Sequence, residues 1–375
     1  MSGPKDDPAR VRAPTAAGTF YPADPAACRT EAEAFIEPWF DRRLASAKRS
    51  HQRGETKQID GAIDAGGRKR WMGGVVPHAG WICSGAIAGR TIGTIAASRR
   101  IEPPLLSGLP HRPDVATAAG PTNATAIADA SRQTQPDVVI VLGAVHTPLP
   151  IHFAALDDYE RWAVPNGSLS GASLVLAELR AKLLAARGRG GDARSSSSLS
   201  AGELFATDDR FHRREHAVEV ELPLIAAAWP DAAIVPVEVP TIALAEEIGR
   251  QIARHVEAMK LDAVILASSD LTHYGPAYRF APAGVGLNGL KWAKQNDRRL
   301  LDRIEKFDPG EIVPEVQSNF NACGGGAIAA MLSACHELGA NVACVLHHAN
   351  SYETLAVIDP QPPDNAVGYA SVVVG

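Results

Sequence analysis

The chain has 375 residues, of which 46% are hydrophobic and 21% are charged, the balance of a globular protein with an apolar core. Its formal net charge of −5 provides no positive field for phosphate backbones or anionic lipid, so we expect neither nucleic acid nor a membrane as a partner. The five cysteines are odd in number, widely spread and without a C-x-x-C pair, which argues against a disulfide framework and a structural zinc finger.

The N-terminal residues 1–10 are polar and lack the apolar centre of a signal peptide. No stretch of the chain approaches the roughly 20 apolar residues that cross a bilayer. We therefore expect a cytoplasmic protein.

Strand-like and helix-like patterns alternate along the chain. Apolar runs predict strands at 74–76, 137–142, 233–239, 262–267, 341–346 and 367–374. Helical spacing predicts helices at 25–40, 84–97, 243–258, 288–306 and 325–338. Such alternation is typical of the α/β class. Because α/β folds often spend more than about 200 residues on one core, we predict a single large domain over residues 1–375.

The predicted helix 243–258 has an apolar residue at every fourth position, namely Leu244, Ile248, Ile252 and Val256. This spacing places them on one face, which we expect to be buried.

Three stretches have the composition of surface loops or disorder, and we predict them to be insertions without catalytic residues. They are 42–70, rich in Arg, Lys, Gln and Gly; 99–135, rich in Pro, Ala, Thr and Asp; and 187–208, which contains a run of serines.

Histidines follow three of the predicted strands. His78 follows 74–76, His146 follows 137–142, and His273 follows 262–267. In an open α/β sheet, ligands bind at the carboxyl ends of the strands, so these imidazoles can converge on one site. A lone histidine there is more often a helix cap or a partner of a backbone carbonyl, but parallel placement favours a site. We predict His78 and His146 to be metal ligands.

Cys323 precedes the glycine run Gly324–Gly326 at the start of the predicted helix 325–338. The helix dipole and unpaired amides favour a thiolate at this place, and the glycines let backbone approach closely. We predict a metal ligand, a redox thiol or a nucleophile. The alternative is a small buried packing residue beside a glycine turn.

Asp270 and His273 stand three residues apart, so they share a face if a helical turn begins there. We predict His273 to be a general acid/base that Asp270 orients; the alternative is an N-cap followed by an exposed histidine. His216 and Glu219 have the same spacing. We predict that they support the metal ligands or line the pocket, the alternative being the start of an amphipathic surface helix.

Two common enzyme classes lack their signatures. The chain contains neither an H-E-x-x-H motif nor a G-x-x-x-x-G-K-[ST] loop, which removes the main support for a zincin protease or a P-loop nucleotide hydrolase.

Taken together, these segments resemble the Memo family, whose bacterial members are often called AmmeMemoRadiSam system protein B. The resemblance covers residue 12 to the C-terminus apart from the insertions. It rests on seven motifs in order: Arg12–Pro22, Val76–Trp81, Leu142–His146, Glu215–Glu219, Ser268–His273, Ala322–Gly324 and Val367–Ser371.

The resemblance implies a mixed, mostly parallel central sheet flanked by helices, similar to the catalytic subunit of class III extradiol dioxygenases. Those enzymes use non-haem iron(II) to cleave catechol-type rings. In that comparison His78 and His146 match metal-ligand positions, and His273 matches the acid/base histidine.

Two departures from these patterns matter. Cys323 falls where the dioxygenases have a glutamate ligand, and a thiolate is softer, prefers copper(I) or zinc, and is itself oxidisable. Thr147-Pro148-Leu149 stands where the family often carries another histidine.

We therefore predict a mononuclear pocket of His78, His146 and Cys323 that binds iron(II), with copper and zinc as alternatives. The expected activity is that of a dioxygenase-like oxidoreductase of unknown substrate. A zinc-type hydrolase using the same pocket is one alternative. Another is a non-catalytic binding module that engages a peptide or protein, since fold and motifs do not establish catalysis. The family name further suggests radical-SAM and AMMECR-type protein partners.

Overall fold

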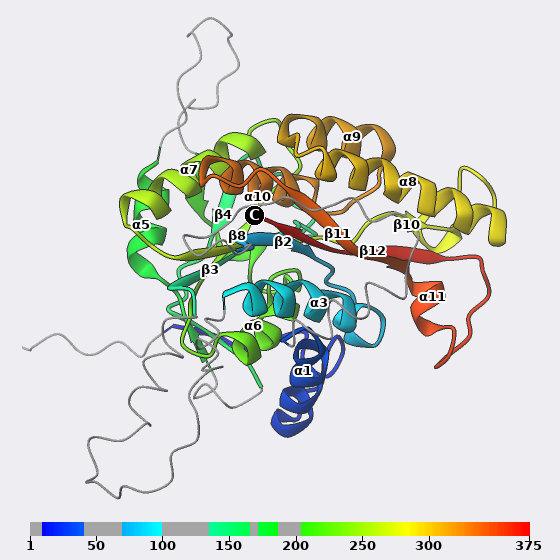
Figure 1. The fold of residues 1–375 in the computed structure, drawn as a ribbon, viewed down its shortest axis with the longest axis horizontal. Helices are drawn as coiled ribbons and strands as arrows, with labels where there is room; N and C mark the ends of the chain where they lie inside the picture. The colour runs from blue at the N-terminus through cyan, green and yellow to red at the C-terminus, as the bar shows by residue number, and fades with distance from the viewer. Residues whose placement is uncertain (1–9, 41–69, 100–134, 166–171, 187–203) are drawn as a thin grey trace, which may run out of the picture.

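The computed structural model describes residues 10–40, 70–99, 135–165, 172–186 and 204–375 (Figure 1). Its helices are α1 (Pro25–Phe40), α3 (Trp81–Arg99), α5 (Ala177–Ala185), α6 (Leu222–Ala228), α7 (Ala245–Ala258), α8 (Leu287–Glu305), α9 (Ile312–Asn319), α10 (Gly325–Glu337) and α11 (Ser351–Leu355). Among these described helices, none combines the length and the apolar character needed to span a membrane.

The strands form one α/β domain around a large sheet. They are β1 (Val11–Arg12), β2 (Gly73–Val76), β3 (Val138–Gly143), β4 (Ala154–Leu156), β5 (Arg161–Ala163), β6 (Ala172–Leu174), β7 (Phe205–Thr207), β8 (Ala233–Glu238), β9 (Ala263–Ser268), β10 (His273–Tyr274), β11 (Ala343–Asn350) and β12 (Ala366–Val374). Nine of the described strands form the large sheet. Eight of them run in the order β10-β12-β2-β9-β3-β8-β4-β7, and the ninth, β11, pairs with β12. A small second sheet has the order β1-β5-β6.

The predicted mixed sheet is confirmed, and its parallel part is the centre. Strands β2, β9, β3 and β8 are all parallel neighbours. Antiparallel pairs flank them, β12 with β2 on one side and β4 with β8 on the other. The carboxyl ends of the four central strands therefore lie at one edge of the sheet.

Helices cover both faces of the sheet (Figure 1). On one face, Ile140 and Leu142 of β3 pack in a cluster with α7, α8, α9 and α10. Val139 and Val141 of the same strand point to the other face and pack with α1, α3 and α6. Strands buried on both faces must be apolar at every position, which explains why their sequences are unbroken apolar runs.

The four central strands end in register. Val76 of β2 pairs with Ser268 of β9, Ser268 with Gly143 of β3, and Gly143 with Glu238 of β8. Neighbouring strands lie about 4.8 Å apart. The loops that follow these four strands therefore begin close to one another. The shared row brings together residues that lie far apart in the chain, such as Val76 and Ser268.

Two sequence-based expectations need correction. Leu244 is not buried with its helical neighbours but 47% exposed, because α7 begins one residue later and Leu244 only caps it. The insertion predicted at 187–208 ends too late, since Phe205–Thr207 form β7 and pair with β4. The insertions predicted at 42–70 and 99–135, and the first part of the third, lie outside the described residues apart from their ends.

The helix face of α7 provides a test of the fold. Ile248 is fully buried against α10, so Ile248→Ala is expected to lower the free energy of unfolding by about 2–5 kcal/mol. Leu244→Ala is the matched control, because the same helical face is exposed there, and it should cost no more than about 1 kcal/mol. Denaturant unfolding of both variants measures the difference; equal losses would contradict this packing.

Candidate metal centre

Three imidazoles meet at the carboxyl edge of the sheet. His78 follows β2, His146 follows β3, and His216 comes from the segment between β7 and α6. The ring of His78 lies 5.1 Å from that of His146 and 5.2 Å from that of His216, centroid to centroid, and His146 stacks on His216 at 4.7 Å. One ligand nitrogen from each lies within 4.8 Å of the others, a group that can hold a metal ion.

The ring orientation of His78 is fixed from behind. Its Nδ1 lies 2.8 Å from Oγ of Ser268, and that hydroxyl donates its own proton to the carbonyl of Ala217 at 2.6 Å. Ser268 can therefore only accept from Nδ1–H, which leaves Nε2 as the free nitrogen of a neutral ring. Metal-binding histidines are typically held in this way by a partner on the other ring nitrogen.

Glu215 holds the other two imidazoles. Its Oε1 lies 2.8 Å from Nδ1 of His146 and 3.2 Å from Nδ1 of His216. The backbone amides of His146 and His216 also donate to this carboxylate. Burial opposes its ionisation, but the two imidazoles hold the pKa of Glu215 well below its usual range. A single carboxylate thus directs Nε2 of both rings away from itself.

Cys323 lies directly against this group. Its Sγ is 3.3 Å from Nε2 of His78, the nitrogen that Ser268 leaves free. Burial opposes ionisation of the thiol, but the charge of His78 and hydrogen bonds from His146 and His78 lower the pKa of Cys323 to about 5. In turn, burial disfavours charge on His78, while the thiolate and Asp270 raise its pKa to about 9. Without metal, the pocket is thus a thiolate–imidazolium pair.

The glycine run after Cys323 places the thiol. A Cβ at Gly324 would lie 2.7 Å from the Cβ of Ser269, and one at Gly326 would lie 2.0 Å from the carbonyl oxygen of Pro240. The start of α10 therefore packs backbone to backbone against the loops after β9 and β8. This confirms the predicted close approach and explains why Cys323 reaches the strand ends.

Asp270 and His273 come together, although not on the expected helical turn. Asp270 lies in the loop after β9, whereas His273 belongs to β10, and their side chains are 3.9 Å apart. Asp270 also accepts a hydrogen bond from the backbone amide of His78 at 2.9 Å. Burial opposes protonation of His273, but Asp270 and the Cys323 thiolate raise its pKa. An acid/base pair therefore stands beside the thiol.

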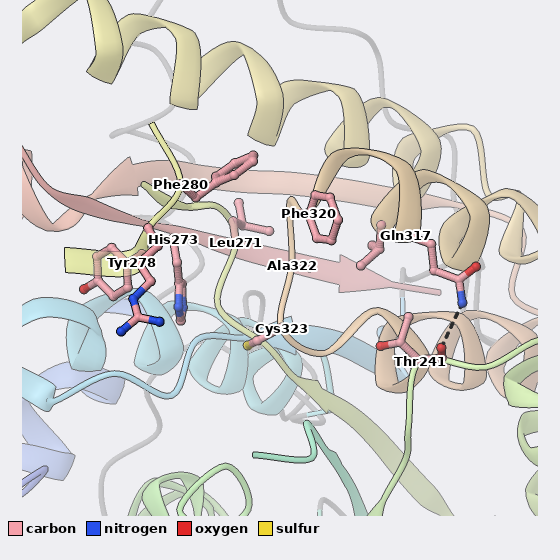
Figure 2. Close-up of a pocket in the computed structure, with 11 residues that line it drawn as sticks. Thr241, Leu271, His273, Tyr278, Phe280, Gln317, Phe320, Ala322 and Cys323 are labelled. Atoms are coloured by element: carbon pink, nitrogen blue, oxygen red, sulfur yellow. Dashed lines mark hydrogen bonds between the residues drawn. The ribbon is translucent and has the colours of Figure 1, made fainter. Parts of the chain in front are cut away.

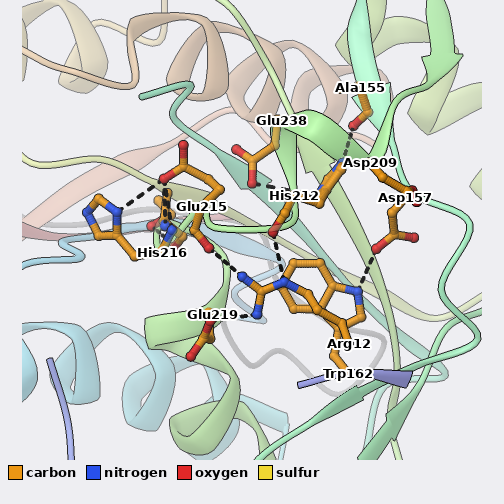
Figure 3. A network of polar contacts seen from close by, with 12 residues as sticks. Arg12, Ala155, Asp157, Trp162, Asp209, His212, Glu215, His216, Glu219 and Glu238 are labelled. Carbon is orange, nitrogen blue, oxygen red and sulfur yellow. Dashed lines mark hydrogen bonds and ion pairs between the residues drawn. The ribbon is translucent and has the colours of Figure 1, made fainter. Parts of the chain in front are cut away.

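Glu219, which has the same spacing from His216 as Asp270 has from His273, does not contact His216 but faces the N-terminal segment. Its fully buried carboxylate forms an ion pair with Arg12 and accepts hydrogen bonds from Tyr21 at 2.7 Å and from the amide of Ala16 at 2.7 Å. Figure 3 shows Arg12 between Trp162 and Glu219. The spacing of three gave no information here, because Glu219 belongs to a short 3-10 turn that faces the N-terminal segment.

Arg12 links that segment to the site. Its guanidinium donates to the carbonyls of His212, at 2.8 Å, and Glu215, at 2.7 Å, and stacks 4.1 Å above the ring of Trp162. The two carbonyls lie at either end of the segment 212–215, so Arg12 fixes the backbone that carries Glu215 (Figure 3). Breaking a buried ion pair of this kind is strongly destabilising.

A second buried carboxyl lies behind the imidazoles. Glu238 ends β8 and extends over Gly143, where a Cβ would lie 2.3 Å from its Oε2. Its other oxygen is 3.8 Å from Nδ1 of His212. Burial and the neighbouring Glu215 raise the pKa of Glu238 well above its usual value. Glycine at 143 is therefore required by this carboxyl group, since a side chain there would collide with it.

Two cavities open on the candidate site. One, of about 590 Å³, is lined by Cys323 and His273 together with Leu271, Phe280 and Phe320 (Figure 2). Tyr278 also lines it, and its ring centroid is 5.1 Å from that of His273. The other, of about 440 Å³, is lined by His146 and His216. A largely apolar cavity with a few polar groups is the usual form of a small-molecule site.

The sequence did not single out several of these residues. Ser268 and Glu215 stood inside quoted motifs, but nothing distinguished Glu215 from Glu219 and Glu221 before their contacts were seen. His216 was expected to support the ligands, whereas its nitrogen is as close to the shared space as theirs. The aromatic lining of the larger cavity comes from segments with no motif.

The acidity of Cys323 is testable on metal-stripped protein. With a pKa of about 5 the thiol is a thiolate at neutral pH, so iodoacetamide should alkylate Cys323 with half-maximal rate near pH 5. Cys83 is the control within the same chain, because it is also partly exposed but burial raises the pKa of its thiol. Peptide mass spectrometry measures both rates; a Cys323 profile that rises only in alkaline solution, like that of Cys83, would contradict the imidazolium pairing.

Comparison with known proteins agrees with the motif order. The family model described as "Memo-like protein" matches residues 109–373, a span that includes His146, His216, His273 and Cys323. A "MEMO1 family protein" of Pyrococcus abyssi is 26% identical over 374 residues, 97% of this chain and 99% of that protein. One of Thermococcus kodakarensis is 28% identical over 373 residues with the same coverage.

A shorter match and one solved structure complete the comparison. A "MEMO1 family protein" of Methanosarcina acetivorans is 34% identical over 177 residues, 46% of this chain and 60% of that protein. The crystal structure of an uncharacterized Escherichia coli K12 protein aligns at 16% identity with a TM-score of 0.35, covering 64% of this chain and 87% of that one. The family match over residues 109–373 decides the assignment: the chain belongs to the Memo family.

Proposed function

We propose that the protein binds a mononuclear metal ion through His78, His146 and Cys323 and acts as a dioxygenase-like oxidoreductase. One observation carries the proposal. Two imidazoles with Nδ1 already occupied, at 2.8 Å each, present Nε2 toward a thiolate that is 3.3 Å from one of them. The Nε2 atoms of His78 and His146 and the Sγ of Cys323 are therefore the donor atoms that we propose for the metal.

We propose iron(II) as the metal because the resemblance to class III extradiol dioxygenases implies it; copper and zinc are the alternatives. Imidazole suits all three metals, and thiolate adds a preference for the softer ones. Metal binding here would release protons, because the pKa of His78 is about 9 and a coordinating imidazole must be neutral. We therefore expect affinity to rise with pH through this range.

Substrate chemistry is proposed to take place in the larger cavity. Leu271, Phe280 and Phe320 would exclude water from an apolar part of the substrate and position it beside Cys323. When bound, iron(II) would supply one-electron redox chemistry toward dioxygen. His273, with Asp270 at 3.9 Å, is placed to take or return a substrate proton.

A zinc-type hydrolase is the second candidate, and one observation favours it. His216 offers a third imidazole nitrogen within 4.8 Å of those of His78 and His146. Three imidazoles with an open fourth position are a known zinc set that lowers the pKa of bound water to about 7. In that case Cys323 would stand beside the metal instead of binding it.

Metal analysis of variants separates these sets. Plasma mass spectrometry on anaerobically purified protein should find near-stoichiometric iron in the wild type and little in His78→Ala, His146→Ala or Cys323→Ser. His216→Ala removes a neighbour instead of a ligand, so it should weaken affinity by roughly 10–100-fold and still load when metal is in excess.

The control is His348→Ala, since His348 on β11 pairs with Asp297 on α8 and its loss should leave the metal content unchanged. Full retention in Cys323→Ser combined with loss in His216→Ala would favour the three-imidazole zinc set. No metal in the wild type, even after anaerobic reconstitution, would overturn both enzyme proposals and leave a non-catalytic binding module.

A further inference from the structure

The smaller cavity has a different character from the larger one. Its volume is about 440 Å³, and its lining includes His146, His216 and three arginines, Arg210, Arg213 and Arg214. The chain as a whole carries a net charge of −5, so three guanidinium groups at one cavity are a local exception. The proposed metal chemistry gives these side chains no role.

Two of the three arginines have no partner within the described residues. Arg210 is held by Asp208, whose oxygens accept its Nε and Nη2 at 2.8 and 2.6 Å. Arg213 and Arg214 are exposed, and their side chains form no hydrogen bond or ion pair with any described group. The acid nearest in sequence, Glu215, is already engaged by two imidazoles. No ion pair with a described residue therefore compensates the charges of Arg213 and Arg214 at this cavity.

The backbone beneath these arginines is anchored on both sides. Phe211 and His212 precede them and are buried, with exposures of 1% and 0%, and Glu215 follows with 3%. The Arg12 guanidinium bonds the carbonyls of His212 and Glu215, and the Arg213 amide donates to the carbonyl of Asp209 at 2.8 Å. The two guanidiniums thus project from a fixed turn, so less order has to be gained when a ligand binds.

We propose that this cavity binds the oxyanion group, carboxylate or phosphate, of a small molecule and places it beside His146 and His216. Arginine presents a planar fork of donors that matches such groups in pairs, and hydrogen bonds between ions are stronger than those between neutral groups. Thr147, Pro148 and Glu215 complete the lining, and the carboxylate of Glu215 is already held by His146 and His216. An anionic small molecule would then be the substrate of the proposed metal site. Only the word substrate rests on the proposed function; anion binding does not.

Anion binding is measured directly on full-length protein. Inorganic phosphate and benzoate are titrated calorimetrically into metal-free and metal-loaded samples at low ionic strength. The double variant Arg213→Gln/Arg214→Gln should bind the preferred probe at least about tenfold more weakly than the wild type. Which probe binds more tightly assigns the group as phosphate or carboxylate.

Two further variants control the result. Arg279→Gln removes an exposed arginine from the larger cavity and should leave probe binding unchanged. Arg213→Lys/Arg214→Lys keeps the charge without the fork, so it should bind more tightly than the Gln variant and less tightly than the wild type. Both Arg213 and Arg214 are exposed, and a circular dichroism spectrum checks that the variants fold.

The outcomes separate the two proposals. Unchanged probe binding in the Gln double variant, equal loss in Arg279→Gln, or no binding by the wild type at tens of millimolar would each overturn the anion site. Metal content is measured on the same samples. Arginine-dependent anion binding without any metal would sustain the anion site and remove the metal-dependent function instead.

Discussion

The in-register ending of four parallel strands is the constraint on which the rest of the molecule depends. Val76, Ser268, Gly143 and Glu238 form one row across β2, β9, β3 and β8. Helices cover both faces of the sheet, so the side chains that follow this row gather at its carboxyl edge. A shift of one strand by a single residue would turn its buried side chains to the opposite face. Position along the ladder therefore decides which side chains meet at this edge more firmly than any local motif does.

Several charged groups near the pocket are each held by a neighbour. Glu215 orients two imidazoles, and Arg12 in turn fixes the backbone of Glu215 while neutralising Glu219. The thiolate of Cys323 is stabilised by the imidazoles that it faces. Low local dielectric makes such pairs strong when complete and costly when one member is lost. Arg213 and Arg214 at the smaller cavity differ, because their backbone is fixed in the same way but their exposed guanidinium groups have no partner among the described residues.

The sequence predicted the parts that follow from periodicity and failed where contacts cross the chain. The α/β alternation was readable because strands buried on both faces are largely apolar. His78 and Cys323 stood out because His78 follows the end of a clear strand and Cys323 precedes the start of a clear helix. Leu244 misled because helical spacing does not show where the helix begins. Glu215 and Glu219 could not be separated, since their roles depend on an arginine more than 200 positions earlier. The arginine-lined cavity was missed for the same reason.

The most direct test of the central claim is X-ray absorption spectroscopy at the metal edge of the anaerobically loaded protein. With zinc distances as a guide, a His/His/Cys centre should show one sulfur scatterer about 2.3 Å from the metal and nitrogen scatterers about 2.0–2.1 Å from it. The sulfur contribution should disappear in Cys323→Ser. A wild-type spectrum with nitrogen and oxygen neighbours alone would show that Cys323 is not a ligand and would contradict the His/His/Cys centre.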